Sequence, residues 1–147
     1  MTTTAPRTRN EAQIRECVNS WTQALHAKNL DALMSHYAHD VITFDLMPPS
    51  QVDGAERYRK NFERWFAETS GPIDYELHDL HITAGEEVAF CHCLGHVKGI
   101  RANGEQADYW VRVTVGFQKR NDRWLMTHDH VSMPFDMQTM TAVSDRR

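Results

Sequence analysis

Asp45 is the residue whose position most strongly suggests acid–base chemistry. It follows the short apolar segment 41–44 and precedes a loop stiffened by Pro48 and Pro49. A carboxylate held against apolar surface has a raised pKa, because burial disfavours its charged form, and it then becomes a better base near neutral pH. Removal of a proton from carbon requires such a base. The alternative is a loop aspartate that accepts hydrogen bonds from backbone N–H groups of the turn.

A second candidate group lies on the segment 109–117, where residue types alternate as in a strand. One face carries only apolar side chains and is expected to be core. The other face carries Trp110, Arg112 and Thr114. An indole ring, a guanidinium and a hydroxyl in a row suit a small anion or an oxygen-bearing apolar ligand. The alternative is a surface that faces a second subunit, with Arg112 in a salt bridge.

The last predicted strand places two imidazoles close together. Strict alternation puts Trp124, Met126, His128, His130 and Ser132 on one face. A His-x-His pair can chelate a metal, but a metal site needs a third ligand, and nothing in the sequence fixes one. We therefore expect no metal. An acid–base role for His130, hydrogen bonding by His128 and plain packing remain open alternatives.

These residues must be positioned by an α+β fold. Apolar spacing predicts helices over 11–27, from about 29 to 37, and over 55–68, with a short strand over 41–45 between the last two. Four strands follow, at 74–83, 88–98, 107–119 and 124–134, separated by short polar turns typical of hairpins. We expect a curved antiparallel sheet, wrapped by the N-terminal helices around an internal apolar pocket.

The third predicted helix carries an aromatic stripe on one side. Its members are Tyr58, Phe62, Trp65 and Phe66. Such a stripe at helical spacing is typical of core rather than of a cofactor site, and no nucleotide-binding or nucleophile motif is present. We expect Tyr58 and Phe62 to form part of the ligand-binding wall and the protein to need no cofactor.

Composition limits the classes of function. The 147 residues carry a net charge of −4 with both signs interspersed, so no basic stripe is available for nucleic acid. No run of about 18 apolar residues exists for a membrane span. We read Cys17, Cys91 and Cys93 as reduced, small, buried residues. The expected organisation is a flexible N-terminus (1–10), one domain (11–134) and a C-terminal tail (135–147) lying loosely on the surface or on a partner, in a cytoplasmic protein.

The order of elements and several short motifs resemble one known group of proteins. The matching residues are Ala24-Leu25, Leu30-Asp31-Ala32-Leu33, Tyr37-Ala38-His39-Asp40-Val41, Phe44-Asp45, Gly54, Trp110, Arg112, Thr114, Trp124 and His128-Asp129-His130-Val131-Ser132. They are similar to the SnoaL-like, ketosteroid-isomerase-like proteins of the nuclear-transport-factor-2-like superfamily. The resemblance spans about 11–134 and implies a cone-shaped fold, but its motifs are short, and this superfamily includes both enzymes and non-catalytic modules.

The resemblance also implies roles for individual residues. In ketosteroid isomerase an aspartate moves a proton while a tyrosine and a protonated aspartate donate hydrogen bonds to the developing oxyanion. Asp45 matches the base. Trp21 falls near the expected tyrosine and Thr114 near the protonated aspartate, so an indole N–H, a hydroxyl or Arg112 would have to replace those donors.

Two functions follow as expectations. The first is a cofactor-independent isomerase, cyclase or hydratase acting on a small apolar carbonyl compound, with Asp45 as base and Arg112, Trp110 and His130 orienting the substrate or stabilising the enolate. The second is a non-catalytic module that binds a small apolar or carboxylate-bearing molecule or assembles with itself. The segment 124–134 and Thr43-Phe44 ahead of Gly54 also resemble the association domain of calcium/calmodulin-dependent kinase II. For either function the resemblance implies a homodimer formed through the convex face of the sheet.

Overall fold

Three helices and a six-stranded sheet make up most of the computed structural model, which describes residues 4–146. The helices are α1 (Thr4–His26), α2 (Leu30–Met34) and α3 (Ala55–Ala67). The strands are β1 (Tyr37–Phe44), β2 (Val52–Asp53), β3 (Thr69–Ala84), β4 (Val88–Arg101), β5 (Gln106–Arg120), β6 (Arg123–Ser132), β7 (Phe135–Asp136) and β8 (Thr141–Ala142). No helix in this range is both long and apolar enough to span a membrane.

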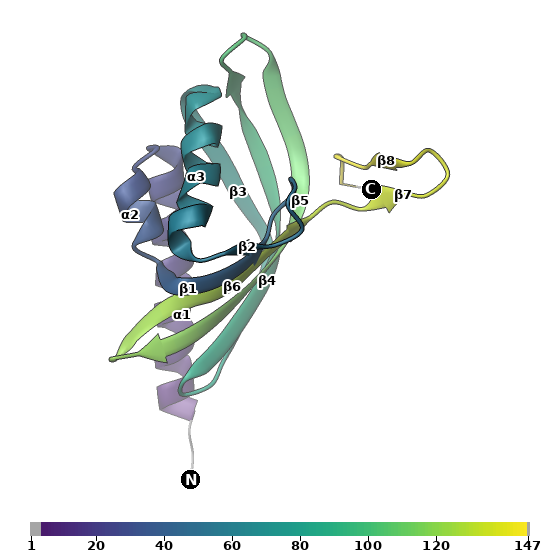
Figure 1. Cartoon of the computed structure of the whole chain (residues 1–147). Helices are drawn as coiled ribbons and strands as arrows, with labels where there is room; N and C mark the ends of the chain where they lie inside the picture. The colour runs from purple at the N-terminus through teal and green to yellow at the C-terminus, as the bar shows by residue number, and fades with distance from the viewer. Residues whose placement is uncertain (1–3, 147) are drawn as a thin grey trace.

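The sheet has the order β2-β1-β6-β5-β4-β3. Strands β3 to β6 form the predicted antiparallel meander, joined by tight turns. Strand β1, whose direction the sequence left open, pairs with β6 in parallel, so the sheet is antiparallel except at this pairing. Hairpin turns force antiparallel neighbours, but α3 and four strands (β2 to β5) separate β1 from β6 in the chain, so no turn fixes their direction. The long strands curve, and the helices lie on one side of them (Figure 1).

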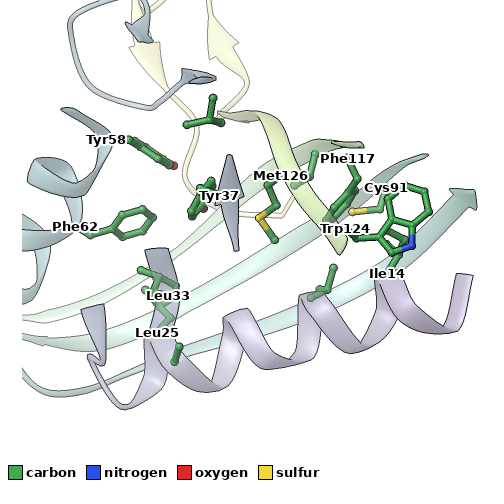
Figure 2. Packing of buried hydrophobic residues seen from close by; sticks show 14 of the residues in the cluster. Ile14, Leu25, Leu33, Tyr37, Tyr58, Phe62, Cys91, Phe117, Trp124 and Met126 are labelled. Carbon is green, nitrogen blue, oxygen red and sulfur yellow. The ribbon is translucent and has the colours of Figure 1, made fainter. Parts of the chain in front are cut away.

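The core fills the space between the helices and the inner face of the sheet. From α1, the fully buried Ile14 and Leu25 pack there. From α3 come Tyr58 and Phe62 (Figure 2). Helical periodicity thus predicts the buried stripes correctly, because a helix hides one side against the sheet.

Two helix boundaries differ from the prediction. Helix α1 starts at Thr4, seven residues before the predicted Glu11. Asn10 is buried there: its amide N–H donates to the carbonyl of Gly85, and its amide oxygen accepts from Lys119 Nζ, which ties this first part of the helix to the sheet. Helix α2 ends at Met34, so Tyr37 begins β1 rather than completing the helix.

The C-terminal segment is more ordered than expected. Strands β7 and β8 form a hairpin that projects away from the helices (Figure 1). Beyond it, the carbonyl of Ser144 accepts a 2.7 Å hydrogen bond from the backbone N–H of Trp110. The Arg146 guanidinium lies 5.0 Å from the centre of the Trp110 ring and pairs with Asp79. The tail therefore returns to the sheet beside β5.

Candidate active site

A cavity of about 490 Å³ lies between the inner face of the sheet and the helices. This volume suits a small molecule. Its wall is mainly apolar and includes Trp21, Phe62, Cys91, Cys93, Val111, Val113, Val115, Met126 and Val131. The three cysteines are free, and burial raises the pKa of Cys91 to about 12 and that of Cys93 to about 11, so both are neutral wall residues.

Asp129 is the principal polar group of this cavity. It lies on β6, 4% exposed, among apolar neighbours. Its Oδ2 accepts a hydrogen bond from the Tyr37 hydroxyl at 3.0 Å and another from the Tyr58 hydroxyl at 3.2 Å. The indole N–H of Trp21 in turn donates to the Tyr37 oxygen at 2.9 Å. Three elements outside β6 thus contribute to holding one carboxyl group.

The surroundings of Asp129 change its acidity. Burial, and then the negative charge of Asp45, raises the pKa of Asp129 to about 6, although the hydrogen bonds from Tyr37 and Tyr58 act in the opposite direction. Burial also raises the pKa of both tyrosines well above the usual value, so they stay neutral donors. A carboxyl group with this pKa can exchange a proton near neutral pH.

Two oxygen atoms beside this network have no hydrogen-bond partner. They are Asp129 Oδ1 and Thr43 Oγ1, both buried. Thr43 and Asp129 are paired positions on the adjacent strands β1 and β6. A buried polar atom without a partner costs about 1–3 kcal/mol. Of these two residues Asp129 lines the cavity, so its Oδ1 marks a place where a bound molecule or water can supply the missing hydrogen bond.

Asp45 also lines the cavity, as predicted, just after β1 ends. Its Oδ2 accepts a hydrogen bond from the Asn61 amide of α3 at 2.9 Å. Its Oδ1 accepts from the backbone N–H of Leu46 at 2.8 Å, so the loop-capping alternative is also observed. The neighbouring Leu46 and Met47 are exposed, which places Asp45 at the mouth of the cavity.

The inner and outer faces of β6 differ from the sequence prediction. Phe117 of β5 pairs with Met126, and the next residue back, Gly116, pairs with His128, so Thr127 is an extra residue in the strand. This bulge interrupts the alternation. Trp124 and Met126 are buried, and Asp129 follows them on the inner face, whereas His128 and His130 lie on the outer one.

The predicted site residues therefore separate into two groups. Asp45, Trp21, Tyr58 and Phe62 line the cavity. The residues that do not line it are Trp110, Arg112, Thr114, His128 and His130. The inner face of β5 carries Val111, Val113 and Val115, so alternation sends the other three β5 side chains outward. Arg112 is exposed and donates to Ser132 Oγ and to the carbonyl of Met133.

The sequence prediction missed Asp129 and Tyr37 as members of this site. Tyr37 was assigned to a helix, and Asp129 was hidden by the bulge. One signal was present: counting back from Val131 in steps of two reaches Asp129, and both residues line the cavity. Counting forward from Trp124 in steps of two instead places Asp129 on the opposite face. Only the pairing with β5 decides between these two assignments.

Known structures share this architecture. A protein of unknown function from Pseudomonas putida KT2440, described as NTF2-like, has 29% sequence identity and a TM-score of 0.87, covering 95% of this chain and 97% of that one. A ketosteroid isomerase-like protein from Erwinia carotovora atroseptica has 14% identity and a TM-score of 0.72, covering 84% and 95%. A candidate calcium/calmodulin dependent protein kinase II association domain from Xanthomonas campestris has 18% identity and a TM-score of 0.72, covering 81% and 84%.

These similarities confirm the predicted fold and both sequence resemblances. The comparison with curated proteins finds no match. The model of the SnoaL-like domain matches residues 14–136. Since this match covers more than half of the sequence, the chain belongs to the SnoaL-like domain family, with an NTF2-like fold.

Proposed function

We propose that the cavity catalyses proton transfer on a small, largely apolar carbonyl compound, in a reaction of the isomerase, cyclase or hydratase type. One observation carries the proposal. The buried carboxyl group of Asp129 is fixed by Tyr37 and Tyr58 through one oxygen, and its other oxygen lacks a partner. A second carboxyl group, that of Asp45, lines the same cavity.

The two carboxyl groups have different surroundings, which suits them to different roles. Asp45 lies at the mouth and accepts two hydrogen bonds, one from the Asn61 amide and one from the backbone N–H of Leu46. Burial raises the pKa of Asp129 to about 6, which favours its protonated form. Pairs of carboxyl groups with such contrasting environments commonly divide into a base and an acid.

In the proposed reaction, Asp45 removes a proton from the carbon next to the carbonyl group. The electron pair of the broken C–H bond moves to form an enol or enolate, and Asp129 in its acid form donates a hydrogen bond or its proton to the oxygen. Return of the proton from Asp45 to a different carbon gives an isomer. Proton transfer of this kind uses only groups that the chain supplies.

The rest of the cavity suits such a substrate. The apolar wall excludes water, which strengthens the interaction between a developing oxyanion and its donor. Arg64 and Arg101 also line the cavity and could pair with a carboxylate group on the substrate. We therefore expect a compound with an apolar body and a carbonyl group, with or without a carboxylate.

The test is exchange of carbon-bound hydrogen in D₂O. A panel of apolar ketones and enones is incubated with the protein, and deuterium in the position next to the carbonyl group is followed by NMR. Wild type should catalyse exchange for at least one member, and Asp45→Asn and Asp129→Asn should each abolish it. His130→Ala, on the outer face, is the matched control and should retain it. Equal exchange in all variants would contradict the proposal.

A non-catalytic role is the second candidate, and the fold similarity to an association domain favours it. In that case the cavity binds an apolar carboxylic acid without turnover. Thermal stabilisation by such an acid, together with no exchange across the whole panel, would support binding alone.

We also propose that the protein is a homodimer formed through the outer face of the sheet. Val88 and Phe90 of β4 are 65% and 46% exposed there, an unusual position for two large apolar side chains on neighbouring rungs of a sheet. Light scattering should show a dimer for wild type and a monomer for Phe90→Asp. A monomeric wild type would contradict the dimer proposal.

The free cysteines suit a reducing cytoplasm, where we place the protein.

A further inference from the structure

Three side chains with metal-binding atoms meet on the outer face of the sheet. They are Glu76 and His78 of β3 and His96 of β4. One ligand atom from each lies within 4.8 Å of the other two. The register explains the meeting: Glu76 and His96 are directly opposite each other, and His78 is two residues further along the same face. None of the three lines the cavity.

His78 supplies an independent sign of a missing partner. Its Nε2 is buried and has no hydrogen-bond partner. The ring packs 4.8 Å from the ring of Trp110, measured between centres. An imidazole nitrogen that is buried without a hydrogen bond costs folding free energy, and a bound metal ion would offset that cost. The Nε2 of His78 is therefore an available ligand atom.

His96 is already held in an orientation that suits coordination. Its ring stacks on Trp110 with centres 4.3 Å apart and planes at 9°. Its Nε2 lies 2.7 Å from Asp108 Oδ1, and its Nδ1 lies 3.6 Å from Glu76 Oε1. A carboxylate on one ring nitrogen fixes the tautomer and makes the other nitrogen a better ligand, as is usual for metal-bound histidine.

We propose that Glu76, His78 and His96 bind one divalent transition-metal ion of the Zn²⁺ type. Two imidazoles and one carboxylate are a common ligand set for zinc, with water in the fourth position. His96 would bind through Nδ1, and Asp108 would act as its outer partner through Nε2. The Lys98 ammonium lies 3.3 Å from Glu76 Oε1 and competes with the metal for that carboxylate. The carboxylate has two oxygen atoms, so one can bind the metal while the other stays paired with Lys98.

The site would join β3 and β4 where β3 is irregular. The pairing of these strands shifts register between His78 and His81, and Asp79 there has a positive φ of 56°. Strand β3 is an edge strand of the sheet. A metal ion bound to residues of both strands, just before this register shift, would hold β3 against β4. The predicted absence of a metal came from His128 and His130 on β6, and this site uses neither.

The test is titration of the metal-free protein with Zn²⁺ alone by calorimetry and with Co²⁺ alone by visible absorption. Wild type should bind one ion per chain, and bound Co²⁺ should show the intense absorption of tetrahedral coordination. Asp108→Asn should weaken binding about 10–100-fold. His78→Ala and His96→Ala should weaken it at least as much. Glu76→Gln changes a half-exposed side chain conservatively, so it should bind more weakly while keeping the fold.

His92→Ala is the matched control, because His92 lies on the outer face of β4 and faces His81 with ring centres 5.2 Å apart. It should leave the affinity and the Co²⁺ spectrum unchanged. Circular dichroism identifies any variant that fails to fold. If His78→Ala or His96→Ala fails to fold, the metal affinities of Glu76→Gln and Asp108→Asn decide the test. The proposal is overturned if wild type binds no ion, if these variants bind as wild type does, or if His92→Ala removes the signal.

Discussion

The two faces of the same sheet carry different chemistry. The inner face borders a mainly apolar cavity, covered by helices, whose lining includes the carboxyl groups of Asp45 and Asp129. The outer face holds imidazoles and the partly buried Trp110 ring, and Phe90 is exposed on it. Burial raises the pKa of Asp129 to about 6, so the inner face carries a group that can exchange a proton near neutral pH. The imidazoles and the exposed apolar side chains of the outer face suit metal binding or contact with a second subunit.

The assignment of a residue to one face depends on single-residue events. The bulge at Thr127 decides that Asp129, rather than His128 or His130, faces the cavity. Residues three positions apart in β6 consequently share the inner face at this point, instead of residues two apart. The following substitutions test this difference between the two faces.

The largest effect is expected from Asp129→Asn on any reaction that the cavity catalyses. The variant keeps a group that can accept hydrogen bonds from Tyr37 and Tyr58 but can no longer exchange a proton. General acid–base catalysis contributes about 10²–10⁴-fold to a rate. Turnover of a substrate found by the exchange assay should fall by a factor in that range. A variant with wild-type turnover would remove Asp129 from the mechanism.

The same residue should make stability depend on pH. The pKa of Asp129 is about 6 in the folded chain and about 3.9 when unfolded, so the folded state binds the proton more tightly. This contribution is fully present below about pH 4 and is lost as pH rises to about 6. It amounts to about 3 kcal/mol. Denaturant unfolding should show this loss for wild type relative to Asp129→Asn, and parallel profiles would contradict it.

A smaller effect is expected when the hydroxyl of Tyr37 is removed. In Tyr37→Phe, Asp129 loses one donor and the Trp21 N–H loses its acceptor. The free energy of unfolding should fall by about 1–3 kcal/mol. The pKa of Asp129 should rise further, because the lost hydrogen bond favours the charged form. Carboxyl NMR titration measures this shift.

Tyr58→Phe is the matched control for that change. Tyr58 also donates to Asp129 Oδ2, but the indole of Trp21 hydrogen-bonds to Tyr37 and not to it. Tyr58→Phe should also raise the pKa of Asp129, but with a smaller loss of folding free energy than Tyr37→Phe. Equal losses for the two variants would show that the bond from Trp21 contributes nothing.

The smallest effect is expected from Arg112→Ala. Arg112 is exposed on the outer face and bonds only to Ser132 Oγ and the carbonyl of Met133 among the described residues. Exposed polar contacts of this kind contribute little. Turnover, the pKa of Asp129 and the free energy of unfolding should all stay near wild type. A marked loss of turnover would mean that the outer face takes part in the reaction.

Much of the fold could be predicted because it follows from local patterns. The aromatic spacing from Tyr58 to Phe66 predicts α3, and the polar turns around Gly85, Asn103 and Asn121 predict the meander. The parallel pairing of β1 with β6 could not be predicted, because no short connection constrains it. Asp45, Tyr58 and Phe62 were found for the same local reasons, whereas Tyr37, Tyr75 and Tyr109, which also line the cavity, were not.

The centre of the candidate site could not be predicted in the same way. Tyr37, Tyr58 and Asp129 lie far apart in the sequence and come together only through tertiary packing. The cluster of Glu76, His78 and His96 likewise depends on the exact register of β3 and β4. Residue types alone do not encode such cross-strand positions.

The return of the C-terminal segment to β5 has a consequence for how the two faces communicate. Strand β6 ends at Ser132, opposite Arg112, and the carbonyl of Ser144 takes over hydrogen bonding to β5 at Trp110. Ser144 also lines the cavity, whereas Arg146, two residues later, lies over the Trp110 ring on the outer face of the sheet. A molecule that displaces this segment from inside would uncover the indole outside, so occupancy of the interior could be followed by tryptophan fluorescence.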